Sequence, residues 1–397
     1  MRDPEFRTGT RTLKLVGRAA LISVVIGRHA ASQRGGAPPV QLRAATATLR
    51  EDFTRVSGVR ELADGRLLVS DIMEERVVVA DFAGQKVEPI GRRGEGPAEY
   101  RRPSAMYALR GDSTVLMASS RWLIFNGAEI VSIVPPDNPG VAATFAGLRY
   151  ADASGNLAGW SVDRPTPGVE DAGVHDSGTI IFVRRQSARI DTIAKVVRTP
   201  QRFFAWNDPA TGMTQFNASA AAFATSEDFL LFPDGWLAVI RLNPYRVEWR
   251  TPGGKWIRGA PLPLPLARVT DREKAFYMKR WERAANAPVN QYLHAPAELR
   301  PALMSAARRR FTEFPEFVPP FMGMSAVPTP EGNVVIPRTP TADEPTPIYD
   351  EVNRSGQLTR RIGLAAGQRI VGFGKRSIYV SSEDSDGLEH LSRHPWP

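Results

Sequence analysis

The chain has 397 residues, of which 42% are hydrophobic and 9% aromatic, so it can form a packed core and does not have the composition of a disordered chain. It contains no cysteine, which excludes disulfides and thiolate metal sites. The formal net charge is +9, but residues 1–32 carry six basic and two acidic side chains, so much of the excess lies near the N-terminus and we expect no nucleic-acid partner.

The first 32 residues have the form of an export signal. Basic residues between positions 11 and 18 precede the apolar run 19–27, and small residues at 30–32 suit a cleavage site. Nine apolar residues are too few to span a bilayer as a helix. We therefore predict a signal peptide or a disordered leader over residues 1–32, a periplasmic or secreted location, and no transmembrane span in the mature chain.

Over residues 33–397 a tight polar turn recurs six times, each time followed by short apolar runs rich in β-branched and aromatic residues. The turns are Asp64-Gly65, Gly111-Asp112, Ser154-Gly155-Asn156, Asp234-Gly235, Glu331-Gly332 and Gly374-Lys375. A repeated unit of about 40 residues built from short strands is typical of a β-propeller blade. We therefore predict an all-β fold, a six-bladed β-propeller of four-stranded blades, over residues 33–397.

The innermost strand of each blade is predicted just before its turn. These strands are expected at 56–62, 103–109, 145–151, 228–232, 322–328 and 369–374. The last blade has only three strands before the chain ends at Pro397. The segment 41–51 alternates in the strand manner, so we expect it to supply the fourth strand and close the ring, which would remove two exposed sheet edges.

One long segment, about 263–317, departs from the strand pattern between the fourth and fifth blades. Its Thr270-Asp271-Arg272-Glu273 has the form of a capping box and predicts a helix over about 271–285, and Pro301 is a favoured first residue for a second short helix. This helical insertion could pack on the rim of the propeller or cover its channel, and the sequence leaves both readings open.

Residues 69–109 contain a recognisable motif. An Asp precedes a short loop, an Arg begins the next strand, and a series of glycines then leads to a Pro and a Glu-Tyr pair. Its members are Asp71, Arg76, Asp81, Gly84, Gly91, Gly94, Gly96, Pro97, Glu99, Tyr100 and Pro103. This stretch resembles the NHL-type repeat and related six-bladed propellers of bacterial secreted proteins. The resemblance implies a six-bladed propeller that serves as a recognition scaffold, and it implies no activity.

We read this motif as structural. Asp71 can accept hydrogen bonds from loop amides or from Arg76, while Gly94, Gly96 and Pro97 shape a tight passage between blades. The alternative, that Asp71 or Arg76 contacts a ligand, stays open.

Sequence signals of catalysis are scarce. The histidines form no H-E-x-x-H pair, and neither a G-x-S-x-G nor a Walker-type loop is present. Gluconolactonase-like six-bladed propellers bind calcium through channel carboxylates, but the predicted inner strands offer only Glu61 and Asp228, both at strand ends. We therefore predict a ligand- or protein-binding module without a cofactor, and keep a calcium-dependent hydrolase or lyase of this class as the alternative.

The predicted loops indicate which face would bind. The long connections 163–178, 198–226, 263–317 and 339–347 all fall on one face of a six-bladed array, and insertions on one face of a repeat protein usually mark its binding face. Guanidinium and aromatic groups there would suit an anionic, carbohydrate, peptide or protein partner, although each residue could equally be an ordinary rim residue. The candidate ligand-binding residues are Arg92, Arg93, Tyr100, Arg101, Arg121, Trp206 and Trp281.

Overall fold

The computed structural model describes residues 38–94, 96–118, 122–134, 148–161, 174–184, 189–206, 214–218, 221–286, 313–323 and 325–396. The leader predicted over residues 1–32 and the second helix predicted from Pro301 lie outside the described residues. Within the described ranges the chain folds as a six-bladed β-propeller, as the repeated turns predict.

The first three blades are antiparallel sheets of consecutive strands, and the third carries a fifth strand at its outer edge. Blade 1 holds β3 (Val56–Glu61), β4 (Leu67–Asp71), β5 (Arg76–Asp81) and β6 (Lys86–Pro89). Blade 2 holds β9 (Met106–Ala108), β10 (Ser113–Met117), β11 (Trp122–Asn126) and β12 (Glu129–Val134). Blade 3 holds β13 (Leu148–Ala151), β14 (Leu157–Ser161), β15 (Val174–Val183), β16 (Ile190–Trp206) and β17 (Thr214–Ala218).

The other three blades repeat the pattern, and the last two recruit strands from the N-terminal part of the chain. Blade 4 holds β18 (Asp228–Leu231), β19 (Leu237–Leu242), β20 (Tyr245–Arg250) and β21 (Trp256–Arg258). Blade 5 holds β22 (Val327–Pro328), β23 (Val334–Pro337), β24 (Ile348–Val352), β25 (Leu358–Gly363) and β1 (Val40–Gln41). Blade 6 holds β26 (Gln368–Phe373), β27 (Ser377–Glu383), β28 (Glu389–Pro395) and β2 (Ala47–Phe53).

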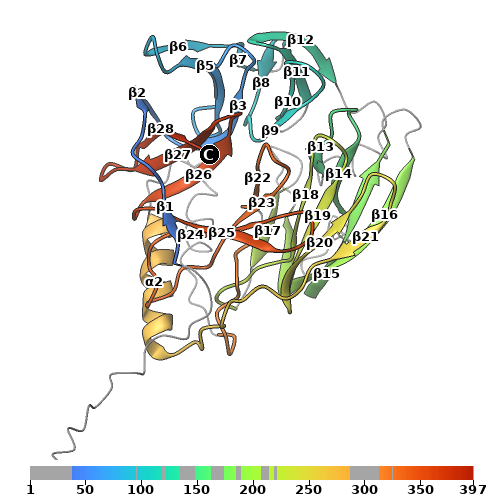
Figure 1. Cartoon of the computed structure of the whole chain (residues 1–397), viewed down its shortest axis with the longest axis vertical. Helices are drawn as coiled ribbons and strands as arrows, with labels where there is room; N and C mark the ends of the chain where they lie inside the picture. The colour runs from blue at the N-terminus through green and yellow to red at the C-terminus, as the bar shows by residue number, and fades with distance from the viewer. Residues whose placement is uncertain are drawn as a thin grey trace, which may run out of the picture. The chain divides into compact units, whose positions relative to one another are not determined.

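Strand β2 lies antiparallel beside β28 and forms the outermost strand of blade 6, with Ala47 opposite Arg393 and Phe53 opposite Glu389 (Figure 1). The predicted segment 41–51 has to be corrected in its bounds, because Val40–Gln41 pair in parallel with β25 of blade 5 instead. The paired segment extends to Phe53 because Leu49 and Phe53 are buried in the core that blade 6 shares with blade 1. Consecutive blades are thus joined by the N-terminal segment.

The blades pack face to face, and this is why their second strands are apolar on both sides. In β4 the side chains alternate between two cores: Leu67 and Val69 belong to the core with blade 6, and Leu68 belongs to the core with blade 2. All three are fully buried. The hairpin turns then require residues with positive φ, and Gly65 supplies it at +86°.

Helix α2 (Asp271–Asn286) agrees closely with the predicted helix, and its N-terminus shows how it is held. The Glu273 amide donates to Thr270 Oγ1 at 3.4 Å, as a capping residue requires. The buried Glu273 carboxylate does not complete the capping box; it accepts from the Ala342 amide of blade 5 at 3.0 Å. Tyr277 stacks on Phe223, with ring centroids 4.1 Å apart, so the first turns of α2 pack on the propeller.

A small parallel sheet of β7 (Arg92–Arg93) and β8 (Glu99–Tyr100) lies between blades 1 and 2 in the chain. In the part of the chain that the structure describes, no helix is long and apolar enough to cross a membrane.

Candidate functional site in the central channel

The innermost strands of all six blades line one cavity of about 1140 Å³. Residues of β3, β9, β13, β18, β22 and β26 all contribute to its wall. These are the strands predicted before the recurring turns, so the sequence already identifies the residues that surround the propeller axis. A cavity of this size can hold a small molecule or the end of a peptide.

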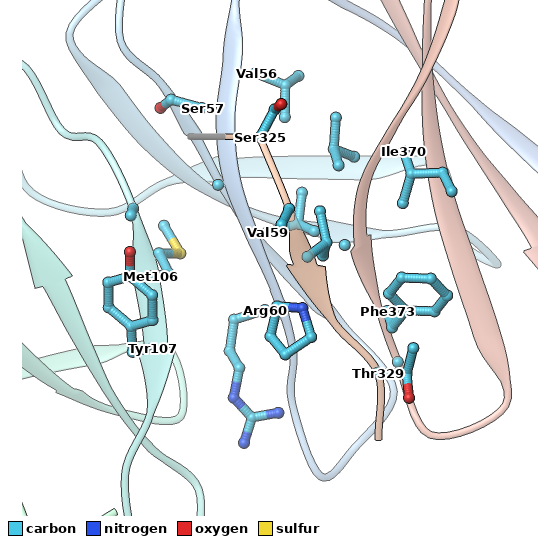
Figure 2. A pocket seen from close by; sticks show the side chains of 18 of the residues that line it. Val56, Ser57, Val59, Arg60, Met106, Tyr107, Ser325, Thr329, Ile370 and Phe373 are labelled. Atoms are coloured by element: carbon cyan, nitrogen blue, oxygen red, sulfur yellow. The ribbon is translucent and has the colours of Figure 1, made fainter. Parts of the chain in front are cut away.

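The middle of the channel wall is mainly apolar. Figure 2 shows Val59, Met106, Tyr107, Ile370 and Phe373 around the same space, contributed by three different blades. Tyr107 also packs edge-to-face on Tyr150 of blade 3, with ring centroids 5.4 Å apart. Burial raises the pKa of both tyrosines, so their phenols are neutral at any physiological pH and the middle of the channel carries no titratable charge from them.

The wall of the channel carries more basic than acidic side chains. Among the described residues, six basic side chains line the cavity together with two carboxylates, Glu61 and Asp112. The basic residues are Arg55, Arg60, Arg280, Arg338, Arg369 and Lys375. Arg55 immediately precedes strand β3 and Arg60 lies near its end, so the Cα atoms of these two residues are roughly 16 Å apart along the extended chain.

Both carboxylates already serve to join blades. Glu61 of blade 1 accepts from the Lys375 amide at 3.0 Å and from the Tyr379 hydroxyl at 2.6 Å, both in blade 6. Asp112 of blade 2 accepts from the Ala63 amide at 2.9 Å. Burial, followed by the nearby Glu61, raises the pKa of Tyr379, so this phenol remains a donor.

This donor set does not fit a calcium centre. Calcium takes six to eight oxygen ligands, several of them carboxylates that converge on one point. In the described ranges, no group of three or more His, Asp or Glu side chains is placed to hold a metal ion. Glu61 and Asp112 are further committed to amide and hydroxyl donors beside Arg60, whose charge would oppose a cation.

Arg60 extends into the channel from β3 (Figure 2). Its Nη1 donates to the Glu61 carbonyl oxygen, while Nε is buried and has no hydrogen-bond partner among the described residues. Burial lowers the pKa of Arg60, partly offset by the charges of Asp112 and Glu61. The guanidinium nonetheless stays protonated, so it adds a positive charge to the wall of the cavity.

At the other end of β3, one carboxylate faces two guanidinium groups. Glu389 accepts from Arg369 Nη2 at 2.5 Å and from Arg55 Nη1 at 3.3 Å, and the Val56 amide donates to it at 2.8 Å. The Glu389 side chain is 2% exposed, whereas the Arg369 and Arg55 side chains are 31% and 54% exposed, so water screens the two arginines more than the carboxylate. It carries an excess of one positive charge at the channel wall.

The residues predicted on the long-loop face lie elsewhere. Arg92 is exposed and pairs with Glu99 at 2.7 Å, and Arg93 pairs with Glu75 at 2.5 Å. Arg101 is exposed, and Trp281 is half-buried on α2 beside the channel residue Arg280. Arg121 and the side chain of Trp206 lie outside the described residues.

The prediction for Tyr100 needs correction, because its side chain is 1% exposed and borders no open surface. Its hydroxyl accepts from the Val77 amide at 2.8 Å and donates to the Ile90 carbonyl oxygen at 2.7 Å. Burial of the aromatic ring in the core between blades 1 and 2 leaves no part of Tyr100 for a ligand.

Asp71 lies where the segment between β2 and β3 meets blade 1. It is 1% exposed and accepts four backbone amides, those of Thr54, Arg55, Met73 and Glu74, at 2.7–3.2 Å. Two of these amides belong to the segment between β2 and β3, so Asp71 ties blade 6 to blade 1.

Arg76 does not pair with Asp71. It forms ion pairs with Glu51 at 2.7 Å and Glu74 at 2.6 Å and also donates to the Asp52 carbonyl oxygen at 2.8 Å. Because Glu51 and Asp52 belong to β2, Arg76 links blade 1 to the outermost strand of blade 6.

The glycines and proline of the motif form a self-contained loop around Glu99. The Gly96 amide donates to Glu99 Oε2 at 2.6 Å, and a Cβ atom at Gly94 would lie 2.1 Å from the same oxygen. Pro97 occupies the turn that leads into β8. These contacts account for the residue types of the motif without a ligand.

Sequence reasoning did not single out the basic residues of the channel. Arg60 and Arg369 were visible as cations within predicted innermost strands that are otherwise apolar, and that contrast is a usable signal. Arg338 and Arg280 carried no such signal. Arg338 follows the second strand of its blade and Arg280 lies on a helix, and neither position predicts that a side chain lines the channel.

No family model matches the sequence, and no curated protein does either. Among solved structures, the chain is similar to a calcium-binding protein, regucalcin, from Agrobacterium tumefaciens, with 12% identity, a TM-score of 0.44, and coverage of 91% of this chain and 97% of that one. A DUF4221 family member from Bacteroides vulgatus shows 6% identity and a TM-score of 0.46, covering 88% and 97%. Virginiamycin B lyase from Staphylococcus aureus shows 8% identity and a TM-score of 0.38, covering 88% and 98%. These likenesses concern the fold.

Proposed function

We propose that this protein is a periplasmic or secreted binding module that takes an anionic ligand into its central channel. The observation that carries the proposal is the charge of the channel wall, where the residues that the structure describes include six basic side chains and two carboxylates. Positive charges along a cleft with low-dielectric walls attract anions and raise their local concentration.

Two features of the channel wall support the binding of an anion inside the cavity. Both channel carboxylates lie near Arg60 and offset part of its charge, but they are outnumbered by the basic side chains among the described residues that line the cavity. Arg60 also extends its guanidinium group into the cavity (Figure 2). A cationic donor there gains a charge-assisted hydrogen bond when a carboxylate or phosphate arrives.

The predicted rim on the long-loop face would be the approach to this channel. Arg101 is exposed outside the cavity and would help to steer an anionic ligand or a partner protein toward it, whereas Arg92 and Arg93 are already paired with Glu99 and Glu75. The export reading rests on the form of residues 1–32 alone.

Calorimetric titration tests the proposal with named probes: octanoate, octyl phosphate, citrate and inorganic phosphate, with maltose as an uncharged control. We expect at least one anion to bind with an affinity that falls as salt is raised. Arg60→Gln should weaken that binding about tenfold or more, since it removes a charge-assisted contact. Arg66→Gln is the matched control, because Arg66 lies on the same hairpin but pairs with Asp64 at the exposed turn.

Equal binding by the two variants would contradict the channel assignment, and so would binding of maltose in preference to every anion. Metal analysis of protein purified without chelator tests the alternative. Stoichiometric calcium, with loss of thermal stability on chelation, would favour the calcium-dependent hydrolase or lyase over the anion-binding module.

A further inference from the structure

Hydrogen bonds between the innermost strands of blades 1 and 6 show which ends of these strands lie together. Near the start of both strands, Arg369 Nη2 of β26 donates to the Val56 carbonyl oxygen of β3 at 2.7 Å. Beyond the end of β26, the Lys375 amide donates to Glu61, the last residue of β3, at 3.0 Å. The two strands therefore run in the same direction along the channel, with Arg369 at one end and Arg60 near the other.

At the Arg60 end, the described side chains that line the cavity are balanced in charge. Arg60 and Lys375 are basic, and Glu61 and Asp112 are acidic. Asp112 accepts from the Ala63 amide, which follows β3, so this carboxylate lies at the same end. Arg60 Nη1 donates to the Glu61 carbonyl oxygen, which keeps the guanidinium group here.

At the Arg369 end, two guanidinium groups share one carboxylate. Arg55 and Arg369 both line the cavity, and they lie 3.3 and 2.5 Å from oxygens of the buried Glu389. Burial lowers the pKa of Arg369, Glu389 offsets part of this effect, and the positive charge of Arg55 lowers the pKa further. Tyr349 adds no charge, because burial raises its pKa. Since arginines stay protonated in proteins, Arg55, Arg369 and Glu389 together hold one positive charge in excess.

Both guanidinium groups at this end keep donors that a ligand can reach. Arg55 uses Nη1 for Glu389, and its side chain is 54% exposed. Arg369 uses Nε and Nη2 for Glu389 and for the Val56 carbonyl oxygen, which leaves Nη1 without a partner among the described residues. Nη1 of Arg369 is not an enclosed atom, and the side chain is 31% exposed.

The channel wall between the two ends carries no charge in these two strands. Residues 56–59 of β3 and 370–373 of β26 all line the cavity, and they are apolar except for Ser57 (Figure 2). The Cα atoms of Arg55 and Arg60 are roughly 16 Å apart along this stretch. An apolar group gains by lying against such a wall, whereas a charged group there would lose its hydration.

We propose that Arg55 and Arg369 form a second anion-binding subsite, and that the ligand is a dicarboxylate whose two carboxylates are joined by an apolar chain. This inference rests on the proposed function and names its ligand class. One carboxylate pairs with Arg60, and the other neutralises the single excess charge at Arg55 and Arg369. A ligand that occupies both subsites gains affinity because its second contact forms within the same complex.

Calorimetric titration with three probes tests the inference. Octanedioate carries two carboxylates on an apolar chain, octanoate has the same chain with one carboxylate, and butanedioate has two carboxylates on a chain too short to reach both ends. The proteins are wild type, Arg55→Gln, Arg369→Gln, Arg60→Gln and Arg376→Gln. Arg376→Gln is the matched control, because Arg376 is exposed on the turn after β26 and is not among the residues that line the cavity. Its replacement removes the same formal charge from blade 6.

We expect octanedioate to bind wild type and Arg376→Gln at least tenfold more tightly than octanoate or butanedioate. In Arg55→Gln, Arg369→Gln and Arg60→Gln this advantage over octanoate should fall to about threefold or less, because only one subsite is left. Circular dichroism and a cooperative melt confirm folding of each variant. If Arg369→Gln does not fold, Arg55→Gln carries the comparison, because it leaves Glu389 paired with Arg369.

Three outcomes would overturn the inference and leave the proposed function in place. If octanedioate binds wild type no more tightly than octanoate while Arg60→Gln weakens both, the channel binds only one anionic group. If butanedioate binds as tightly as octanedioate, the two anionic groups are not separated along the channel. If Arg55→Gln and Arg369→Gln keep the full advantage of octanedioate, its second carboxylate lies elsewhere. Failure of every anion to bind wild type would instead remove the proposed function itself.

Discussion

Replacing Asp71 by alanine should destabilise the whole propeller, because Asp71 accepts four backbone amides at the point where blade 6 joins blade 1. A hydrogen bond to a charged group contributes about 1.5–3 kcal/mol, and these four are not additive. The Met73 and Glu74 amides lie in a short loop that can open to water. The Thr54 and Arg55 amides are held in place by the segment between β2 and β3. We therefore expect Asp71→Ala to lower the free energy of unfolding by about 3–5 kcal/mol.

Two further variants sharpen this experiment. In Asp71→Asn the amide oxygen can replace Oδ1, which accepts from Arg55, Met73 and Glu74, but its NH₂ group would face the Thr54 amide, so we expect about half of the alanine effect. Asp81→Ala is the control, because Asp81 accepts only the Ala83 amide at an exposed turn of the same blade. Its loss should be about 0.5–1.5 kcal/mol.

Urea unfolding followed by tryptophan fluorescence measures these differences, provided that the dependence on urea keeps the same slope in all variants. Anion binding by the folded Asp71→Ala protein should match wild type. The structural reading of Asp71 would be wrong if alanine there cost no more than alanine at position 81, or if stability were unchanged and binding were lost.

Two other predictions concern the ends of the chain. His390 of β28 lies 2.8 Å from Asp52 of the closing strand and 2.8 Å from Asp384; chiefly the hydrogen bond to Asp384 raises the pKa of His390 and lowers that of Asp384. The stabilisation that His390 contributes should be complete below its ordinary pKa of about 6.5 and be lost as the pH rises through its raised pKa. The contribution of Asp384 is lost at acid pH. The melting temperature of wild type should therefore fall more between pH 6 and 8 than that of His390→Gln. Identical slopes for the two proteins would contradict this. For the leader, mass spectrometry of protein from the cell envelope should find residues 1–32 removed, and an intact N-terminus in the cytosol would contradict export.

Much of the fold could be predicted from the sequence because its signals are local. A turn glycine with positive φ, such as Gly65, and the apolar runs that follow it recur with the period of a blade, and the first strand of each blade follows from its place before the turn. The helix at 271–286 was predictable for the same reason, since capping and apolar spacing lie within a few neighbouring residues. The structural role of Asp71 also followed from local chemistry, namely a carboxylate before a short loop of free amides.

The site depends on contacts that no local pattern contains. Arg60, Arg338 and Arg369 line one cavity only because three blades turn their inner edges toward one axis, and packing between blades likewise decides that Arg369 and Arg55 share the buried Glu389. Tyr100 looked like a rim aromatic until packing between blades 1 and 2 buried it. Strand periodicity determines which residues share one face of a sheet. The packing of each blade against its two neighbours determines which residues face the channel, and no local pattern contains that information.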